Sequence, residues 1–387
     1  MPSAKSTSTD PAPASSPPTD ERLPETLLDV LRQWALRQPA APALLDPLGT
    51  VDYLHLLQHV EHIGRALRAQ QLTRDSRIAV AATSGPAMAR LLLGVMAHAV
   101  CVPLDPALDA TTATTLFQRL GLSALIVEGE GAAGLREAAQ RTGVMRLEAR
   151  TGSLDDGPAN GAEHRTDTPD PADGLSPIGA STAYILASSG TTGRAKLVPR
   201  TQRSLFVALR VRARLSNMHE TDVDINPMPL HHAMGFASLM CAVAAGATSV
   251  CLGRFDFAEF ANWAVRTRAT LLAASPVVLD ELTAAAQAQP DALAGWRPAL
   301  IASASSALKP AVLDALVAQF GARVIAHYGM TEASMNASGD LTDPQHRRGS
   351  IGRPALAEVR IVDPQGAALP ANAVGEITLR GDRKSVV

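Results

Sequence analysis

The sequence lacks an excess of either charge, a cysteine framework and an apolar N-terminal segment. Lys and Arg number 35 against 37 Asp and Glu, and the formal charge of -2 gives no long-range field to recruit nucleic acid or an anionic membrane. The three cysteines, Cys101, Cys241 and Cys251, form no CxxC pair, which argues against disulfides and a zinc site and fits a reducing cytoplasm. Residues 1–22 are rich in Ser, Pro, Thr and Ala, so we expect a disordered tail there rather than a signal peptide.

One charge-free stretch, 234–252, has about the length needed to cross a bilayer. Gly246 and Thr248 divide it into a helix-like half and a β-branched half, and no aromatic or basic residue anchors either end. We therefore predict a buried helix followed by a buried strand, and no membrane span.

Short apolar runs alternate with longer helical patterns along the chain, in which 46% of residues are hydrophobic. In the helix predicted at 53–70, apolar residues recur at helical spacing from Leu56 to Leu67, and a second helix is predicted at 310–320. The short runs are too continuously apolar for a sheet with one solvated face, so we predict an α/β protein with sheets buried on both faces. The runs predicted as strands are 77–82, 124–128, 183–188, 248–252, 269–275, 299–303 and 323–329.

The remaining segments suggest the domain boundaries. Residues 149–181 are dense in Gly, Pro and Asp, which is typical of a polar loop. Residues 359–381 alternate apolar and polar side chains around Pro and Gly turns, so we predict a small antiparallel lobe there. We expect one core domain over 23–381 that contains this loop and lobe. The last residues, 382–387, fit the preceding strand pattern poorly, and we interpret them as a non-native tail from sequencing-adapter read-through.

The run ILASSGTTGRAKLVPR, 185–200, has the composition of a phosphate-binding loop. Its glycines allow close backbone approach, its hydroxyls supply donors and Lys196 supplies a positive charge. It is not a Walker loop, because Leu197, Val198 and Pro199 after the lysine favour a strand over a helix. A flexible surface turn is the alternative reading of this run taken alone. The glycines and hydroxyl residues are Ser188, Ser189, Gly190, Thr191, Thr192 and Gly193.

Six motifs in order resemble those of the adenylate-forming enzymes, the superfamily of acyl-CoA synthetases and nonribosomal adenylation domains. They are CVPLDP (101–106), SSGTTGRAK (188–196), MPLHHAMGF (228–236), HYGMTEAS (327–334), GSIGRP (349–354) and VGEITLRG (374–381). The resemblance implies two buried sheets layered with helices, a small β lobe, and a mobile C-terminal domain that is missing here. It also implies that a carboxylate attacks the α-phosphate of ATP, releasing pyrophosphate, and that a thiol captures the acyl-adenylate.

The resemblance implies roles for individual residues. The phosphate loop would hold the β- and γ-phosphates, Glu332 with Thr331 would ligate Mg²⁺, Tyr328 would stack on adenine, and His232 would lie near the carboxylate. Taken alone, Glu332 could instead be a carboxylate in the first turn of a helix, and Tyr328 a core aromatic. The implied catalytic residues are Lys196, His232, Thr331 and Glu332. The implied nucleotide-binding residues are Ser188, Ser189, Gly190, Thr191, Thr192, Gly193, Lys196, Ala304, Ser305, Ser306, His327, Tyr328, Gly329, Met330 and Thr331.

The departures from the family pattern indicate a branch. Ala195 replaces a proline, Leu197 replaces a glycine, and ASASSAL (302–308) replaces a Gly-Gly-Ala-Pro pattern. The variants resemble the acid–CoA ligase branch that includes oxalate–CoA ligase-like enzymes. The motif at 228–236 has no aspartate to pair a substrate ammonium, so we predict an acid without an α-amino group.

Three functions remain open at this point. The first is an acid–CoA ligase that uses ATP, Mg²⁺ and CoA. The second is a loading domain that transfers the acyl group to the phosphopantetheine thiol of a carrier protein. The third is a nucleotide-binding fragment without catalysis, because the family's ribose-binding aspartate, hinge and C-terminal lysine do not follow Gly381. A stripe of His55, His59 and His62 is a weak candidate for a metal face, and we expect it merely to flank an apolar helix face.

Overall fold

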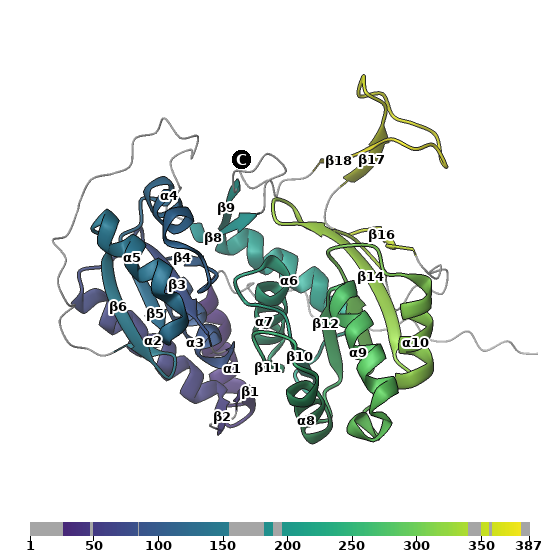
Figure 1. Ribbon diagram of the computed structural model, residues 1–387, viewed down its shortest axis with the longest axis horizontal. Helices are drawn as coiled ribbons and strands as arrows, with labels where there is room; N and C mark the ends of the chain where they lie inside the picture. The colour runs from purple at the N-terminus through teal and green to yellow at the C-terminus, as the bar shows by residue number, and fades with distance from the viewer. Residues whose placement is uncertain are drawn as a thin grey trace, which may run out of the picture.

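Two β-sheets alternate with three layers of helices in this fold (Figure 1). The computed structural model describes residues 26–46, 49–83, 85–154, 182–188, 196–339, 350–355 and 358–380. Both sheets carry buried side chains on their two faces, because separate hydrophobic clusters lie on either side of each. The predicted α/β class with two buried sheets is therefore confirmed.

The larger sheet has nine strands and is mostly parallel in its centre. The carboxyl ends of its parallel strands lie at one edge, where Ser303, the last residue of β13, lies opposite Ala326 and β14 continues beyond it. Loops that follow these strands therefore gather at that edge, which is the usual place for a ligand in such sheets. In spatial order the strands are β16 (Arg353–Pro354), β15 (Ser334–Ser338), β14 (Arg323–Met330), β13 (Leu300–Ser303), β12 (Leu271–Ala274), β10 (Val223–Asn226), β11 (Thr248–Cys251), β1 (Pro42–Asp46) and β2 (Gly49–Asp52).

The smaller sheet has seven strands, and an antiparallel hairpin forms one edge. Its central strands are parallel and fully or almost fully buried. In spatial order they are β7 (Ser153–Leu154), β6 (Met145–Arg150), β5 (Ala124–Glu128), β3 (Arg77–Ala82), β4 (Val100–Pro103), β8 (Thr182–Ser188) and β9 (Lys196–Thr201).

Helices fill the space between the sheets and cover both outer faces. The central layer comprises α1 (Leu27–Arg37), α2 (Tyr53–Ala69), α3 (Gly85–His98), α6 (Gln202–Ser216) and α7 (Ala233–Ala245). The outer layer on the smaller sheet comprises α4 (Ala110–Leu120) and α5 (Ala133–Thr142), with a 3-10 turn at Glu130–Ala132. The outer layer on the larger sheet comprises α8 (Phe257–Thr267), α9 (Pro276–Ala288) and α10 (Pro310–Phe320), with a 3-10 turn at Pro290–Leu293.

The local sequence signals explain where several elements begin and end. The predicted helix at 53–70 is α2, whose N-cap Asp52 accepts a hydrogen bond from the backbone of His55, and whose stripe from Leu56 to Leu67 is buried. The stretch 234–252 falls within α7 and β11, both almost fully buried, as predicted. None of the described helices is long and apolar enough to cross a bilayer.

Two expectations concern segments outside the main sheets. The antiparallel lobe predicted at 359–381 is the hairpin of β17 (Glu358–Val362) and β18 (Glu376–Arg380), which lies apart from the layered body in Figure 1. The polar loop expected from residue 149 begins later, since β6 extends to Arg150 and pairs with β7. The alternating pattern of β6 gives it one buried face and explains the difference. The remaining loop, the N-terminal tail and 382–387 lie outside the described residues.

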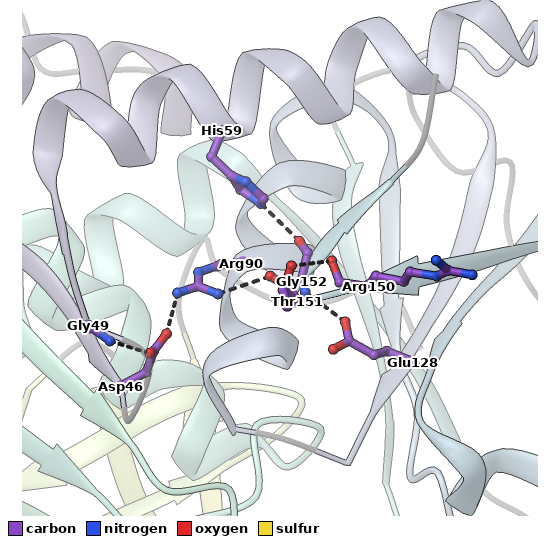
Figure 2. Close-up of polar contacts among 8 residues, drawn as sticks. All are labelled: Asp46, Gly49, His59, Arg90, Glu128, Arg150, Thr151 and Gly152. Carbon is purple, nitrogen blue, oxygen red and sulfur yellow. Dashed lines mark hydrogen bonds and ion pairs between the residues drawn. The ribbon is translucent and has the colours of Figure 1, made fainter. Parts of the chain in front are cut away.

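A polar network ties the two sheets together through α3 (Figure 2). Arg90 on α3 forms a partly buried ion pair with the buried carboxylate of Asp46 at the end of β1, and it also donates to the carbonyl oxygen of Thr151 at 3.0 Å. Thr151 and Gly152 form the tight turn between β6 and β7, with φ of 51° and 76°. A Cβ on Gly152 would come within 2.9 Å of Arg90 Cβ, so this close approach requires glycine.

The same turn is held from two further elements. Glu128 at the end of β5 accepts from the Gly152 amide at 2.7 Å, and His59 Nε2 on α2 lies 2.9 Å from the Gly152 carbonyl oxygen. The neighbouring His62 binds the Leu154 carbonyl oxygen at 2.8 Å. Two histidines of the candidate metal stripe thus serve as partners of the backbone. We call Asp46, His59, Arg90, Glu128 and the turn Thr151–Gly152 the inter-sheet network.

We expect Asp46→Ala to be strongly destabilising. It leaves the largely buried Arg90 guanidinium without its carboxylate, so we expect a loss of roughly 3 kcal/mol in the free energy of unfolding, measured by urea titration. The matched control is Glu148→Ala, which removes the more exposed Arg136–Glu148 pair and should cost no more than about 1 kcal/mol. Equal losses in the two variants would contradict a special role for the inter-sheet network.

We also expect His59 to make stability depend on pH. Burial and the charge of Arg90 lower the pKa of His59 to about 4, from an ordinary value of 6.5. Between pH 6.5 and pH 4, His59 is therefore protonated in the unfolded chain but not in the folded one. The free energy of unfolding thus falls as the pH decreases from 6.5 towards 4. Urea titrations give the free energy of unfolding at pH 7 and at pH 5. The difference between these two values should be smaller in His59→Gln than in the wild-type protein. An unchanged difference would show that other groups govern it.

Candidate active site

The predicted phosphate loop connects the two strands of the edge hairpin in the smaller sheet. Ser188 at the end of β8 pairs in register with Lys196 at the start of β9, so both flank the loop. The strand predicted after the lysine is β9, which confirms that no helix follows it. The residues between them, including Ser189, Gly190, Thr191, Thr192 and Gly193, lie outside the described residues.

The motif at 327–334 forms a hairpin of the larger sheet, and its turn faces the start of β9. Glu332 lies in the turn between β14 and β15, and its Oε1 is 4.0 Å from Lys196 Nζ. The lysine is 49% exposed and the glutamate 19%, so the lysine remains accessible to a ligand. Buried Arg200 on β9 donates to the Glu332 carbonyl oxygen at 3.2 Å. Two motifs from different sheets thus meet at one point.

Glu332 and Thr331 offer one carboxylate and one hydroxyl as possible ligands of Mg²⁺. Thr331 is half-buried in the same turn and supplies a hydroxyl beside the carboxylate. Among the described residues no group of three His, Cys, Asp or Glu side chains is arranged to hold a metal ion. Mg²⁺ commonly binds through one or two carboxylates with phosphate oxygens and waters, so this lone carboxylate fits an ion delivered with a nucleotide.

The predicted base-binding residues lie at the carboxyl ends of β13 and β14. Ala304, Ser305 and Ser306 follow β13, and Ser305 has a left-handed φ of 82° with its Oγ 3.8 Å from Met234 Sδ on α7. Tyr328 is half-buried, while Gly329 and Met330 are exposed at the end of β14. These residues lie at the same edge of the sheet. The side chain of His327 differs, because it is buried and lies 2.6 Å from Ser338 Oγ.

The two histidines of the motif at 228–236 stand between two cavities. His232 is the N-cap of α7 but makes no side-chain cap bond, and its exposed ring lies 4.4 Å from the His231 ring, centre to centre. His231 Nε2 is 3.7 Å from Asp105 Oδ2. Burial, with the neighbouring His232, lowers the pKa of His231 to about 4, so this ring is neutral at physiological pH.

Both cavities are bounded by His231, His232 and Asp105. One, of about 320 Å³, extends towards Thr83 and Arg254. The other, of about 430 Å³, extends along α4 and reaches Ala187, next to the phosphate loop. Asp105 belongs to the motif at 101–106, but only its contact with His231 in the structure shows that it borders both cavities. The sequence did not predict a role for Arg200 either. Its position as a basic residue inside the apolar strand β9 was the signal that could have identified it.

Comparisons with known proteins agree with this arrangement. The family model for AMP-binding enzymes matches residues 31–386. Sulfoacetate–CoA ligase of Cupriavidus necator is 30% identical over 94% of this chain and 71% of its own length. Oxalate–CoA ligase of Arabidopsis thaliana is 28% identical over 74% of this chain and 57% of its own length.

The structural comparison supports the fold over nearly the whole chain. The benzoate–CoA ligase structure from Burkholderia xenovorans has a TM-score of 0.78 at 20% identity and covers 93% of this chain and 72% of that one. At this identity the likeness shows the fold alone. The match of the family model to residues 31–386 means that the chain belongs to the AMP-binding enzyme family.

Proposed function

We propose that the chain carries the core of an acid–CoA ligase, which uses ATP to convert a carboxylic acid to an acyl-adenylate and then transfers the acyl group to a thiol. The observation that carries the proposal is the approach of Lys196 to Glu332 across the two sheets. An ammonium and a carboxylate at one edge are the complementary charges that a magnesium–polyphosphate complex needs. We assign the core domain to 23–381.

In formation of the acyl-adenylate, the residues of the site have separate roles. Lys196 and the phosphate loop stabilise the negative charge that moves onto pyrophosphate. Glu332 and Thr331 would hold Mg²⁺, which would supply charge neutralisation at the phosphates. Tyr328 with 304–306 binds the nucleoside end, and 329–330 border the acyl site, so that the α-phosphate faces the acid.

The acid enters beside His231 and His232. Sulfoacetate–CoA and oxalate–CoA ligases, by their names, act on small acids that carry a second anionic group. The motif at 228–236 offers no carboxylate for an α-ammonium, and leaving that ammonium unpaired in a buried site would be costly. We therefore propose an acid without an α-amino group.

CoA is the thiol that the relatives' names favour, and the cytoplasm, where ATP and CoA are available, is the proposed location. A carrier-protein phosphopantetheine is the competing acceptor, with the same reactive arm. Mixing enzyme-bound acyl-adenylate with free CoA or with a phosphopantetheinylated carrier distinguishes the two. Transfer to the carrier alone would contradict the CoA assignment while leaving the activation step intact.

We expect Lys196→Ala and Glu332→Ala each to lower acid-dependent exchange of pyrophosphate into ATP by roughly 100-fold, because each removes charge stabilisation in the reaction. Binding of a fluorescent ATP analogue, measured with and without Mg²⁺, should weaken in both variants, and the magnesium dependence should diminish in Glu332→Ala.

The control for these variants is Lys309→Ala, which removes an exposed lysine paired with Asp280 on the outer helices. It should leave binding and exchange unchanged. Normal binding and exchange in both site variants would refute the assignment of the site.

We expect His232→Ala to act on the acid rather than on ATP. Its ring is exposed where both cavities meet, so its removal should raise the KM for the acid about tenfold with little change in the KM for ATP. His219→Ala, at an exposed position before β10, is the matched control. A rise confined to the KM for ATP would place His232 on the nucleotide instead.

A further inference from the structure

A buried arginine on β9 reaches across to the turn that carries Glu332. Arg200 is 3% exposed, and its guanidinium donates to the main-chain carbonyl oxygen of Glu332 at 3.2 Å. An arginine is seldom buried this completely, because its charged group loses water and then needs specific hydrogen bonds. The contact joins a strand of the smaller sheet to a turn of the larger one.

Arg200 and Lys196 approach the same glutamate from one face of β9. Side chains alternate along a strand, so positions 196 and 200 share a face. Lys196 Nζ lies 4.0 Å from a carboxylate oxygen of Glu332, whereas Arg200 donates to its main-chain oxygen. A main-chain bond fixes the backbone of Glu332 whichever way the carboxylate turns. The turn can therefore stay in place when the carboxylate leaves Lys196 for a bound ligand.

The guanidinium of Arg200 is itself supported by the neighbouring strand. Tyr184 on β8 lies directly opposite Arg200 in the antiparallel pair. Burial raises the pKa of Tyr184, and Arg200 opposes this rise through its charge and a side-chain hydrogen bond. The Tyr184 ring is 4.5 Å from the ring of Phe236 on α7, centre to centre. Packing against α7 thus limits the movement of Tyr184, and its hydroxyl limits that of Arg200.

A second arginine shows what a purely structural contact of this kind looks like. Arg77 on β3 is half-buried and donates to the Leu120 carbonyl oxygen at 2.6 Å. It begins its strand, whereas Ser188 ends β8, so the two lie at opposite ends of the parallel strands. The acceptor of Arg77 ends a helix, while the acceptor of Arg200 belongs to the proposed metal ligand.

We propose that Arg200 is a positioning residue, which holds the Glu332 turn at a fixed distance from the phosphate loop so that the carboxylate can meet the magnesium ion delivered with ATP. This inference rests on the proposed function. Hydrogen bonds from a charged donor are stronger than neutral ones, and a ligand group placed in advance reduces the ordering that binding requires. Without the anchor, the turn must be ordered at the moment of binding, and the metal contributes less to nucleotide affinity.

The test measures binding without turnover. The dissociation constant of a fluorescent ATP analogue is measured with EDTA and with saturating Mn²⁺ in place of Mg²⁺, and the ratio of the two constants gives the contribution of the metal. We expect Arg200→Met to reduce this ratio roughly tenfold, with little change in the constant measured with EDTA. Arg200→Lys keeps the charge and a donor, so it should recover part of the ratio.

Two further variants complete the comparison. Tyr184→Phe keeps the ring against Phe236 and removes only the hydroxyl that supports Arg200, so it should reduce the ratio less than Arg200→Met does. The matched control is Arg77→Met, which should lower the free energy of unfolding in urea but keep the wild-type ratio. If Arg200→Met does not fold, Arg200→Lys and Tyr184→Phe provide the same comparison. A wild-type ratio in every folded variant of Arg200 and Tyr184 would overturn the proposal.

A second readout needs neither metal nor nucleotide. The Ala333 amide donates to the Met330 carbonyl oxygen at 3.2 Å and so closes the turn around Glu332. Hydrogen exchange of this amide in the free protein should be faster by roughly tenfold in Arg200→Met than in Arg77→Met. Equal exchange rates in the two variants would show that Arg200 does not anchor the turn.

Failure of this inference and failure of the proposed function give different results. If Glu332→Ala abolishes the metal contribution while Arg200→Met keeps it, the metal site stands and the positioning role falls. If Glu332→Ala also keeps it, the assignment of the site falls and the role of Arg200 falls with it. In pyrophosphate exchange, a higher concentration of Mg²⁺ should restore part of the kcat/KM lost in Arg200→Met, and a loss that Mg²⁺ does not restore would contradict positioning.

Discussion

The ion pair between Arg90 and the buried Asp46 is the constraint on which the site depends. Asp46 ends a strand of the larger sheet, while Arg90 also holds the turn at the edge of the smaller one. Lys196 belongs to the smaller sheet and Glu332 to the larger, so their approach requires a fixed spacing between sheets. Gly85 adds to this constraint, because a Cβ there would come within 2.3 Å of the Cys251 carbonyl oxygen.

Three histidines of the described chain act as neutral hydrogen-bonding groups. His59, His231 and His327 all have pKa values lowered chiefly by burial, and each has a defined neighbour in a backbone carbonyl, a carboxylate or a hydroxyl. A neutral ring offers one donor and one acceptor, which makes it a directional group in an apolar setting. The fold therefore uses these rings to orient partners.

Sequence reasoning succeeded where the signal is local. The apolar stripe of α2, the run of β3 and the break at Gly246 each follow from neighbouring residues, and the structure confirms all three. The inter-sheet network could not be predicted from the sequence, because its residues come from five separate segments that share no sequence pattern. The candidate site was predictable as a set of motifs. The pairing of His231 with Asp105 and the bond from Arg200 to Glu332 depend on packing, which no spacing rule contains.

The position of β1 affects how the protein emerges from the ribosome. Leu44 lies opposite Ser249 in a parallel pair, although some two hundred residues of chain separate them. At a synthesis rate of about 5–20 residues per second, β1 waits roughly 10–40 seconds for β11. During that interval the buried face of α1 and the edge of β1 are exposed, since Trp34 and Tyr53 also take their hydrogen-bond acceptors from 244–247. The N-terminal segment therefore keeps apolar surface and a strand edge exposed during translation until 244–251 have been synthesised.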